Sequence, residues 1–177
     1  MQKIQTKKII LGAILAAMSA AIRLSSDYLV PSGGPFALPL YSIPLVISSL
    51  YLGPWFSLIV GFVADLGIGF LGPHGYKPLF VISSLAWSFI PGLIARKNYN
   101  FGKMAIAIII SYLFASLGNT FAIWVHFEKG TAVGSLIVRL VMLISLSPFL
   151  IYINHVIYER LLQAQGVNIA KTTEEIS

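Results

Sequence analysis

The sequence contains no cysteine, which excludes disulfide bonds, thiolate metal sites and thiol catalysis. Charged residues are also scarce: they make up 10% of the 177 residues, against about 25% in a typical soluble domain. Acidic residues are the rarer charged class, with six Asp and Glu against twelve Lys and Arg. A composition this poor in charge leaves no room for a sizeable soluble catalytic domain.

The motifs of common enzyme and metal chemistry are missing too. The sequence has no phosphate-binding P-loop, no HExxH zinc motif, no GxSxG nucleophile motif and no paired intramembrane carboxylates. Its three histidines, His74, His126 and His155, do not have the spacing of metal ligands. We therefore expect a protein that is not an enzyme, with no catalytic residue, no metal and no cofactor of its own.

Long hydrophobic runs dominate what is present, and 57% of the residues are hydrophobic. With about 20 residues per membrane span as the guide, the runs predict helices over residues 9–29, 38–52, 54–71, 79–95, 104–125 and 135–162. The second helix is short and contains Pro39 and Pro44, so we expect it to be tilted, kinked or begun outside the hydrocarbon. The expected fold is an all-α integral membrane protein with six transmembrane helices in residues 1–165 and a polar cytoplasmic tail in residues 166–177.

The basic residues predict the orientation in the cell membrane. They are scattered singly or in pairs, which favours membrane-protein loops over a nucleic-acid surface. In the six-helix layout most fall on one side, namely Lys3, Lys7, Lys8, Arg96, Lys97, Lys103, Arg160 and Lys171. Only Lys77 and Lys129 fall on the other. We therefore expect cytoplasmic N- and C-termini, and outward loops at residues 30–37, 72–78 and 126–134.

The segment GFVADLGIGFLGPHGYKP, residues 61–78, places the acid Asp65 inside an apolar run. A carboxylate at this depth costs about 2.5–3.5 kcal/mol on insertion scales, so it should face protein or a wet cavity. The run ends in a turn-rich loop that carries His74, Tyr76 and Lys77 and could cover a site at the membrane surface. The alternative is that Asp65 is a buried packing residue and the loop a connector.

Charged and aromatic residues gather on the predicted outer side. Arg23 and Arg139 lie near the outward ends of the first and last helices, and an apolar, aromatic pocket with a few fixed charges suits a small, flat, partly polar ligand. The predicted substrate-binding residues are Arg23, Tyr41, Asp65, His74, Tyr76, Lys77, Trp87 and Arg139. The alternatives are an ordinary aromatic belt with interfacial charges and, for Arg23, a local pair with Asp27 four residues on.

Small residues form two adjacent rows on the first helix, with Ala13, Ala17 and Ala21 in one row and Gly12, Ala16 and Ala20 in the other. Such a flat face allows close approach of another helix. We predict that Ala13, Ala17 and Ala21 bind a partner membrane subunit. Packing within the six-helix bundle is the alternative.

Short motifs in a characteristic order carry a family resemblance. They are IRLS at residues 22–25, SIPL at 42–45, LGP at 52–54, VGFVADLG at 60–67, GP at 72–73 and VRL at 138–140 with Pro148. With them the chain resembles, over nearly its whole length, the substrate-binding (S) components of energy-coupling factor (ECF) vitamin transporters, most closely the folate-type family. The resemblance implies a vitamin ligand, a transmembrane coupling (T) subunit and two cytoplasmic ATPases that use the ATP.

The resemblance also bears on the loops, the partner face and the ligand. It implies that the loops at residues 30–37 and 72–78 cover the substrate, and that Ala13, Ala17 and Ala21 meet the coupling subunit. Folate is the ligand implied first. Folate-type members commonly have a basic residue shortly before the second helix, whereas this chain reads GGPFALPLY at residues 33–41. Hydroxymethylpyrimidine, the thiamine precursor, or another small vitamin needs fewer cations and is the alternative; a structural scaffold or small channel is a further one.

Overall fold

The computed structural model describes residues 2–29, 38–73, 75–127 and 129–164, and these are helical with short connections and no strand. The elements in order are α1 (Gln2–Leu29), η1 (Pro39–Tyr41), α2 (Ser42–Leu52), α3 (Pro54–Leu71), η2 (Pro78–Phe80), α4 (Val81–Ala95), α5 (Phe101–His126) and α6 (Lys129–Ala164). The all-α fold predicted from the sequence is confirmed for these residues.

Five helices are long and apolar enough to cross a membrane: α1, α3, α4 together with η2, α5 and α6. The short second helix is confirmed, because α2 has 11 residues. At a rise of about 1.5 Å per residue it covers roughly half of a 30 Å hydrocarbon layer. Six complete spans and cytoplasmic termini therefore remain predictions.

The helix bounds agree with the sequence prediction where glycine and proline mark them. Helix α3 begins at Pro54 and ends at Leu71, as predicted. The turn before it is made by Gly53, whose φ of 102° is a conformation that favours glycine. Helices α1 and α6 begin several residues earlier than predicted, at Gln2 and Lys129. The reason is that the length of an apolar run indicates only the part of a helix inside the hydrocarbon layer, whereas the backbone hydrogen bonds of the helix continue through the polar turns on either side.

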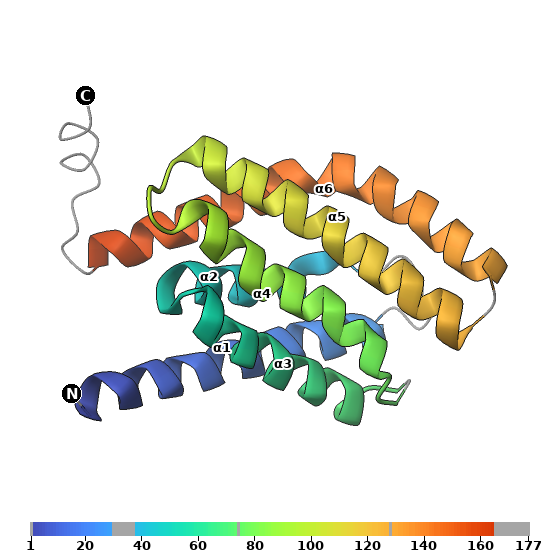
Figure 1. Cartoon of the computed structure of the whole chain (residues 1–177), viewed down its shortest axis with the longest axis horizontal. Helices are drawn as coiled ribbons and strands as arrows, with labels where there is room; N and C mark the ends of the chain where they lie inside the picture. The colour runs from blue at the N-terminus through green and yellow to red at the C-terminus, as the bar shows by residue number, and fades with distance from the viewer. Residues whose placement is uncertain (1, 30–37, 74, 128, 165–177) are drawn as a thin grey trace.

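Figure 1 shows that the first turns of α1, the α4–α5 connection and the last turns of α6 lie at one end of the bundle. We name this the basic end, because Lys7, Lys8, Arg96, Lys97 and Lys103 belong to these segments. The α3–α4 and α5–α6 connections lie at the opposite end. This arrangement agrees with the alternation on which the predicted orientation depends.

Helix α2 forms the centre of the bundle. It packs against α1, α3, α4 and α6, and nine of its residues are buried. Small polar contacts join it to its neighbours: Ser48 is hydrogen-bonded to Ser57 of α3, and Gly92 N of α4 donates to Ser49 Oγ at 2.7 Å. Small residues and hydroxyl groups of this kind allow helices to approach closely in a membrane.

The two rows of small residues on α1 have different environments. Gly12, Ala16 and Ala20 are buried, and a Cβ atom at Gly12 would lie 3.0 Å from Phe56 and 3.1 Å from Val60 of α3. Ala13, Ala17 and Ala21 are exposed. The inner row therefore packs within the bundle, and the outer row presents a smooth surface that the described residues leave uncovered.

Candidate binding cavity

A cavity of about 400 Å³ opens at the end of the bundle opposite the basic end, which we name the cavity end. Side chains of α1, α3, α4, α5 and α6 form its wall, together with η1, η2 and the α3–α4 connection. Its volume lies within the roughly 300–1,000 Å³ of small-molecule sites. The polar and charged residues of the wall are Arg23, Asp27, Tyr41, Asp65, Tyr76, Lys77, Ser83, Ser84, Asn119, Thr131, Ser135 and Arg139.

Most of the predicted substrate-binding residues come together in this wall: Arg23, Tyr41, Asp65, Tyr76, Lys77 and Arg139. Trp87 does not line the main cavity. It is 1% exposed, its ring packs edge-on against Tyr112 at 5.7 Å, and it borders a hollow of about 40 Å³ that shares part of the wall. The prediction for His74 lies outside the described residues.

Asp65 reaches the cavity because α3 and α4 pack unusually close together. A Cβ atom at Gly61, one helical turn earlier, would lie 2.3 Å from Ser88 Oγ and 3.0 Å from the Ser84 carbonyl oxygen. At this approach Ser84 Oγ donates a 3.0 Å hydrogen bond to Asp65 Oδ1. Asp65 is only 7% exposed, and within the described ranges no cation forms an ion pair with it. Its carboxylate therefore faces the cavity with hydrogen-bonding capacity to spare.

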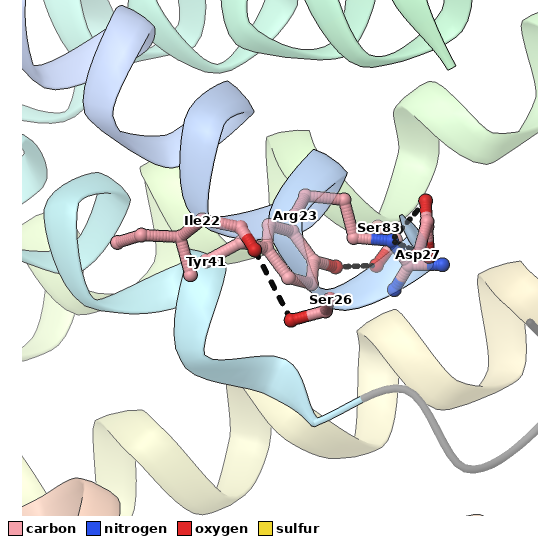
Figure 2. Close-up of polar contacts among 6 residues, drawn as sticks. All are labelled: Ile22, Arg23, Ser26, Asp27, Tyr41 and Ser83. Atoms are coloured by element: carbon pink, nitrogen blue, oxygen red, sulfur yellow. Dashed lines mark hydrogen bonds and ion pairs between the residues drawn. The ribbon is translucent and has the colours of Figure 1, made fainter. Parts of the chain in front are cut away.

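Arg23, in contrast, has a partner within its own helix. Its Nε donates to Asp27 Oδ2 at 3.3 Å and lies 3.2 Å from Oδ1. The guanidinium also lies 5.6 Å from the centroid of the Tyr41 ring, and Figure 2 shows the three side chains together. The local pair predicted from the four-residue spacing is confirmed, so the charge of Arg23 is balanced by Asp27.

A chain of neutral hydrogen bonds crosses the cavity wall from η1 to α5. The Tyr41 hydroxyl lies 2.9 Å from Ser83 Oγ (Figure 2), and Asn119 Nδ2 donates to the same oxygen at 3.0 Å. Ser19 Oγ of α1 donates to the Tyr41 carbonyl oxygen at 2.7 Å. Next to Asn119, a Cβ atom at Gly118 would lie 2.7 Å from the Ile82 side chain. A glycine again brings a polar residue into contact with α4.

Sequence reasoning missed Ser83, Ser84 and Asn119. The available signal was their polarity within apolar segments, since a polar side chain in a span normally faces protein or water. For Asn119 the preceding glycine was a second signal, because small residues mark close helix contacts.

Arg139 is a cation of the wall that has no acidic partner within the described ranges. Its Nη1 is buried without a hydrogen bond, and no described acid forms an ion pair with it. A guanidinium in such a place costs several kcal/mol unless an acceptor or an anion reaches it. The cavity is the direction from which such a group can come.

The chain matches no family model, no curated protein and no solved structure. Its site is therefore characterised by its own geometry. Across the described ranges, no three His, Asp or Glu side chains gather closely enough to hold a metal ion. Besides the paired Arg23 and Asp27, the wall offers the carboxylate of Asp65, the cations of Lys77 and Arg139, and several neutral donors and acceptors. This set suits non-covalent recognition of a small polar molecule.

Contacts of aromatic side chains hold the α3–α4 connection against its neighbours at the cavity end. Lys77 Nζ lies 3.8 Å from the centroid of the Phe127 ring, within the range of a cation–π interaction. Tyr76 stacks on Phe70 at 5.3 Å, and its ring occupies the space where Gly69 lacks a side chain. The loop at residues 72–78 therefore contributes to the cavity wall. That it covers a substrate stays a prediction, and the loop at residues 30–37 lies outside the described residues.

Proposed function

We propose that this protein is the substrate-capture (S) subunit of an ECF-type importer. It binds a vitamin in the cavity and delivers it together with a transmembrane coupling subunit and two ATPases. The observation that carries the proposal is the cavity itself: a space of about 400 Å³ with Asp65 and Arg139 in its wall, at one end of an otherwise apolar helical bundle. A structural scaffold has no need of unpaired charges at such a site.

Folate is the first candidate ligand. Its two carboxylates would require cations, and Arg139 and Lys77 are the cavity cations without an acidic partner among the described residues. The pairing of Arg23 with Asp27 removes one cation from this set. That observation favours the alternative, hydroxymethylpyrimidine, since a smaller uncharged ring needs fewer cations.

Apolar side chains fill the bundle between the cavity and the basic end, and this core favours a binding protein over a small channel. Large side chains that are 0–1% exposed occupy this region, among them Leu45, Trp87, Met104 and Ile108. A pore needs a continuous polar path, and these apolar side chains come from three helices, α2, α4 and α5. A cavity closed at its inner end is what a capture subunit requires.

The exposed row Ala13, Ala17 and Ala21 supports the proposed contact with a coupling subunit. Lipid tails are as apolar as the row itself, so close van der Waals packing, not the hydrophobic effect, would drive docking there. A helix of the partner can approach closely because none of the three side chains extends beyond Cβ.

The decisive experiment identifies the small molecule that co-purifies with the detergent-solubilised protein. We expect a pterin absorbance for folate, or a pyrimidine mass for the alternative, and titration calorimetry with each compound then measures the affinity. Co-expression with a coupling subunit and ATPases should yield a stable complex. A protein that binds neither compound and forms no such complex would contradict the proposal.

A further inference from the structure

A second, smaller space adjoins the main cavity. This hollow has a volume of about 40 Å³, against about 400 Å³ for the main cavity. Two arginines, Arg23 and Arg139, line it, and no described acid does. The other polar groups of its wall are neutral hydroxyl, amide and indole groups, which belong to Tyr41, Ser83, Trp87, Tyr112, Ser116 and Asn119. The hollow is therefore positively charged and rich in hydrogen-bond donors.

The charges around the two spaces do not balance. Among the described residues, three cations (Arg23, Lys77 and Arg139) stand against two acids (Asp27 and Asp65). Asp27 forms an ion pair with Arg23, and Asp65 is also attracted by the charge of Arg23. Lys77 lines only the main cavity, whereas Arg139 lines both spaces and has a buried Nη1 without a hydrogen bond. One positive charge is left over, and the hollow beside Arg139 contains nothing that offsets it.

We infer that the hollow binds one halide ion, chloride under physiological conditions, next to Arg139. A buried guanidinium that lacks an acceptor or an anion is strongly unfavourable. A water molecule would accept hydrogen bonds there but would leave the positive charge uncompensated, whereas a halide does both. Because a guanidinium has five N–H donors, Arg139 can donate to an ion in the hollow and to a ligand in the main cavity at the same time.

The size and the donors of the hollow select a small, round anion. A buried water needs roughly 10–15 Å³ of such space, so about 40 Å³ holds one ion somewhat larger than water and excludes the ring of a vitamin. Tyr112 and Ser116 of α5 supply hydroxyl groups for which the structure shows no hydrogen bond within the described residues. Asn119 donates one amide N–H to Ser83 and keeps a second. Donors from α5 and its neighbour α6 thus surround a single acceptor.

Unfolding temperature as a function of halide concentration tests the inference. The vitamin-free wild-type protein in detergent is titrated with sodium chloride or sodium bromide, while sodium gluconate is reduced to keep the ionic strength constant. A ligand that binds only the folded state stabilises it, so a halide concentration about ten times the dissociation constant should raise the unfolding temperature by about 3–6 °C. The rise should saturate, because one site is filled.

Trp87 provides a second, local signal, because it lines the hollow and is only 1% exposed. It becomes the sole tryptophan in the double variant Trp55→Phe and Trp124→Phe, whose replaced side chains are 73% and 51% exposed. Bromide bound beside Trp87 should quench its fluorescence, and the quenching should saturate over the same concentrations as the thermal effect. Collisional quenching from the solvent increases without saturation.

Three variants assign the ion to the hollow. Arg139→Gln should remove both halide effects. Ser116→Ala should raise the halide dissociation constant at least about 10-fold, since a hydrogen bond to a charged group is lost. The matched control is Ser111→Ala, the same change at another buried position of α5; Ser111 lines neither space and donates to the Ala107 carbonyl oxygen. This control should keep the wild-type dissociation constant.

Equal unfolding temperatures in chloride, bromide and gluconate would overturn the inference, because the hollow then holds no ion. The same conclusion follows if bromide quenching of Trp87 never saturates. Should Arg139→Gln fail to fold, the two serine variants decide, since equal halide dissociation constants for Ser116→Ala and Ser111→Ala are incompatible with an ion in the hollow. Failure of the proposed importer function would leave all these measurements unchanged, because they involve neither a vitamin nor a partner subunit.

Discussion

Replacing Gly61 by alanine tests whether close packing of α3 on α4 builds the cavity. The new Cβ would lie 2.9 Å from Ser88 Cβ and 3.0 Å from the Ser84 carbonyl oxygen. Rotation of the Ser88 hydroxyl would relieve the clash of the new Cβ with Ser88 Oγ. It would not move Ser88 Cβ or the Ser84 carbonyl oxygen. The helices must therefore separate, and Asp65 moves away from Ser84 as they do.

The size of the effect follows from overpacking, which typically costs about 1–3 kcal/mol. Alanine also gains about 1 kcal/mol of helix propensity over glycine, so the matched control is Gly134→Ala in α6, where nothing lies within 4 Å of the new Cβ. The difference between the two variants then isolates the steric clash. At about 2–4 °C per kcal/mol for a chain of this size, Gly61→Ala should unfold about 2–12 °C below Gly134→Ala.

Thermal unfolding in detergent, with intrinsic tryptophan fluorescence as the signal, measures this difference. Ligand titration on the folded fraction should show weaker binding for Gly61→Ala, because Asp65 is displaced. The double variant with Ser88→Gly removes one of the two clashing residues and should recover part of the loss. Equal unfolding temperatures for the two alanine variants would refute the packing argument.

Three further predictions concern the partner face, the cavity and the basic end. Ala17→Trp should abolish co-purification with a coupling subunit and leave ligand binding intact, whereas Ala16→Trp, at a position 3% exposed, should prevent folding. A normal yield of the complex with Ala17→Trp would contradict docking at this face. Arg139→Ala should weaken ligand binding by about 2–5 kcal/mol and Arg23→Ala by less, since Asp27 already neutralises Arg23. If calorimetry gives the wild-type affinity for both variants, the two arginines are only interfacial anchors. Burial raises the pKa of the Tyr99 hydroxyl above its ordinary value of 10.0, so the stabilisation from its neutral form is present below pH 10 and is lost as the pH rises towards the folded-state pKa. In measurements of unfolding temperature against pH, Tyr99→Phe should therefore remove this alkaline loss. An alkaline slope equal to that of the wild-type protein would contradict the prediction.

Much of the fold could be predicted from the sequence, because hydrophobic run length and helix-breaking residues are local signals. The apolar runs located every long helix, and Gly53 and Pro54 marked the boundary between α2 and α3. The positions of Asp65 and Arg139 in the cavity wall were also accessible, since isolated charges in apolar segments must face protein or water.

The contacts between helices could not be predicted in the same way, because they depend on how each helix is rotated about its axis. Trp87 was expected in the pocket as an aromatic residue of the outer side, but its ring packs against Tyr112 beneath the main cavity. Ser84 was overlooked although it is hydrogen-bonded to Asp65. Its role depends on Gly61, whose missing side chain brings α3 onto α4.

Helix α1 has a double use. Its inner side supplies Arg23 and Asp27 to the cavity wall and holds Tyr41 through Ser19, and its outer side carries the exposed row that includes Ala17. A protein that docks on the outer side and shifts or rotates this single rigid rod also displaces groups at the ligand. Thermodynamic reciprocity then requires the ligand to change the affinity for the docked protein by the same factor as that protein changes the affinity for the ligand. An occupied and an empty subunit would thus compete unequally for a shared partner, without any separate signalling element.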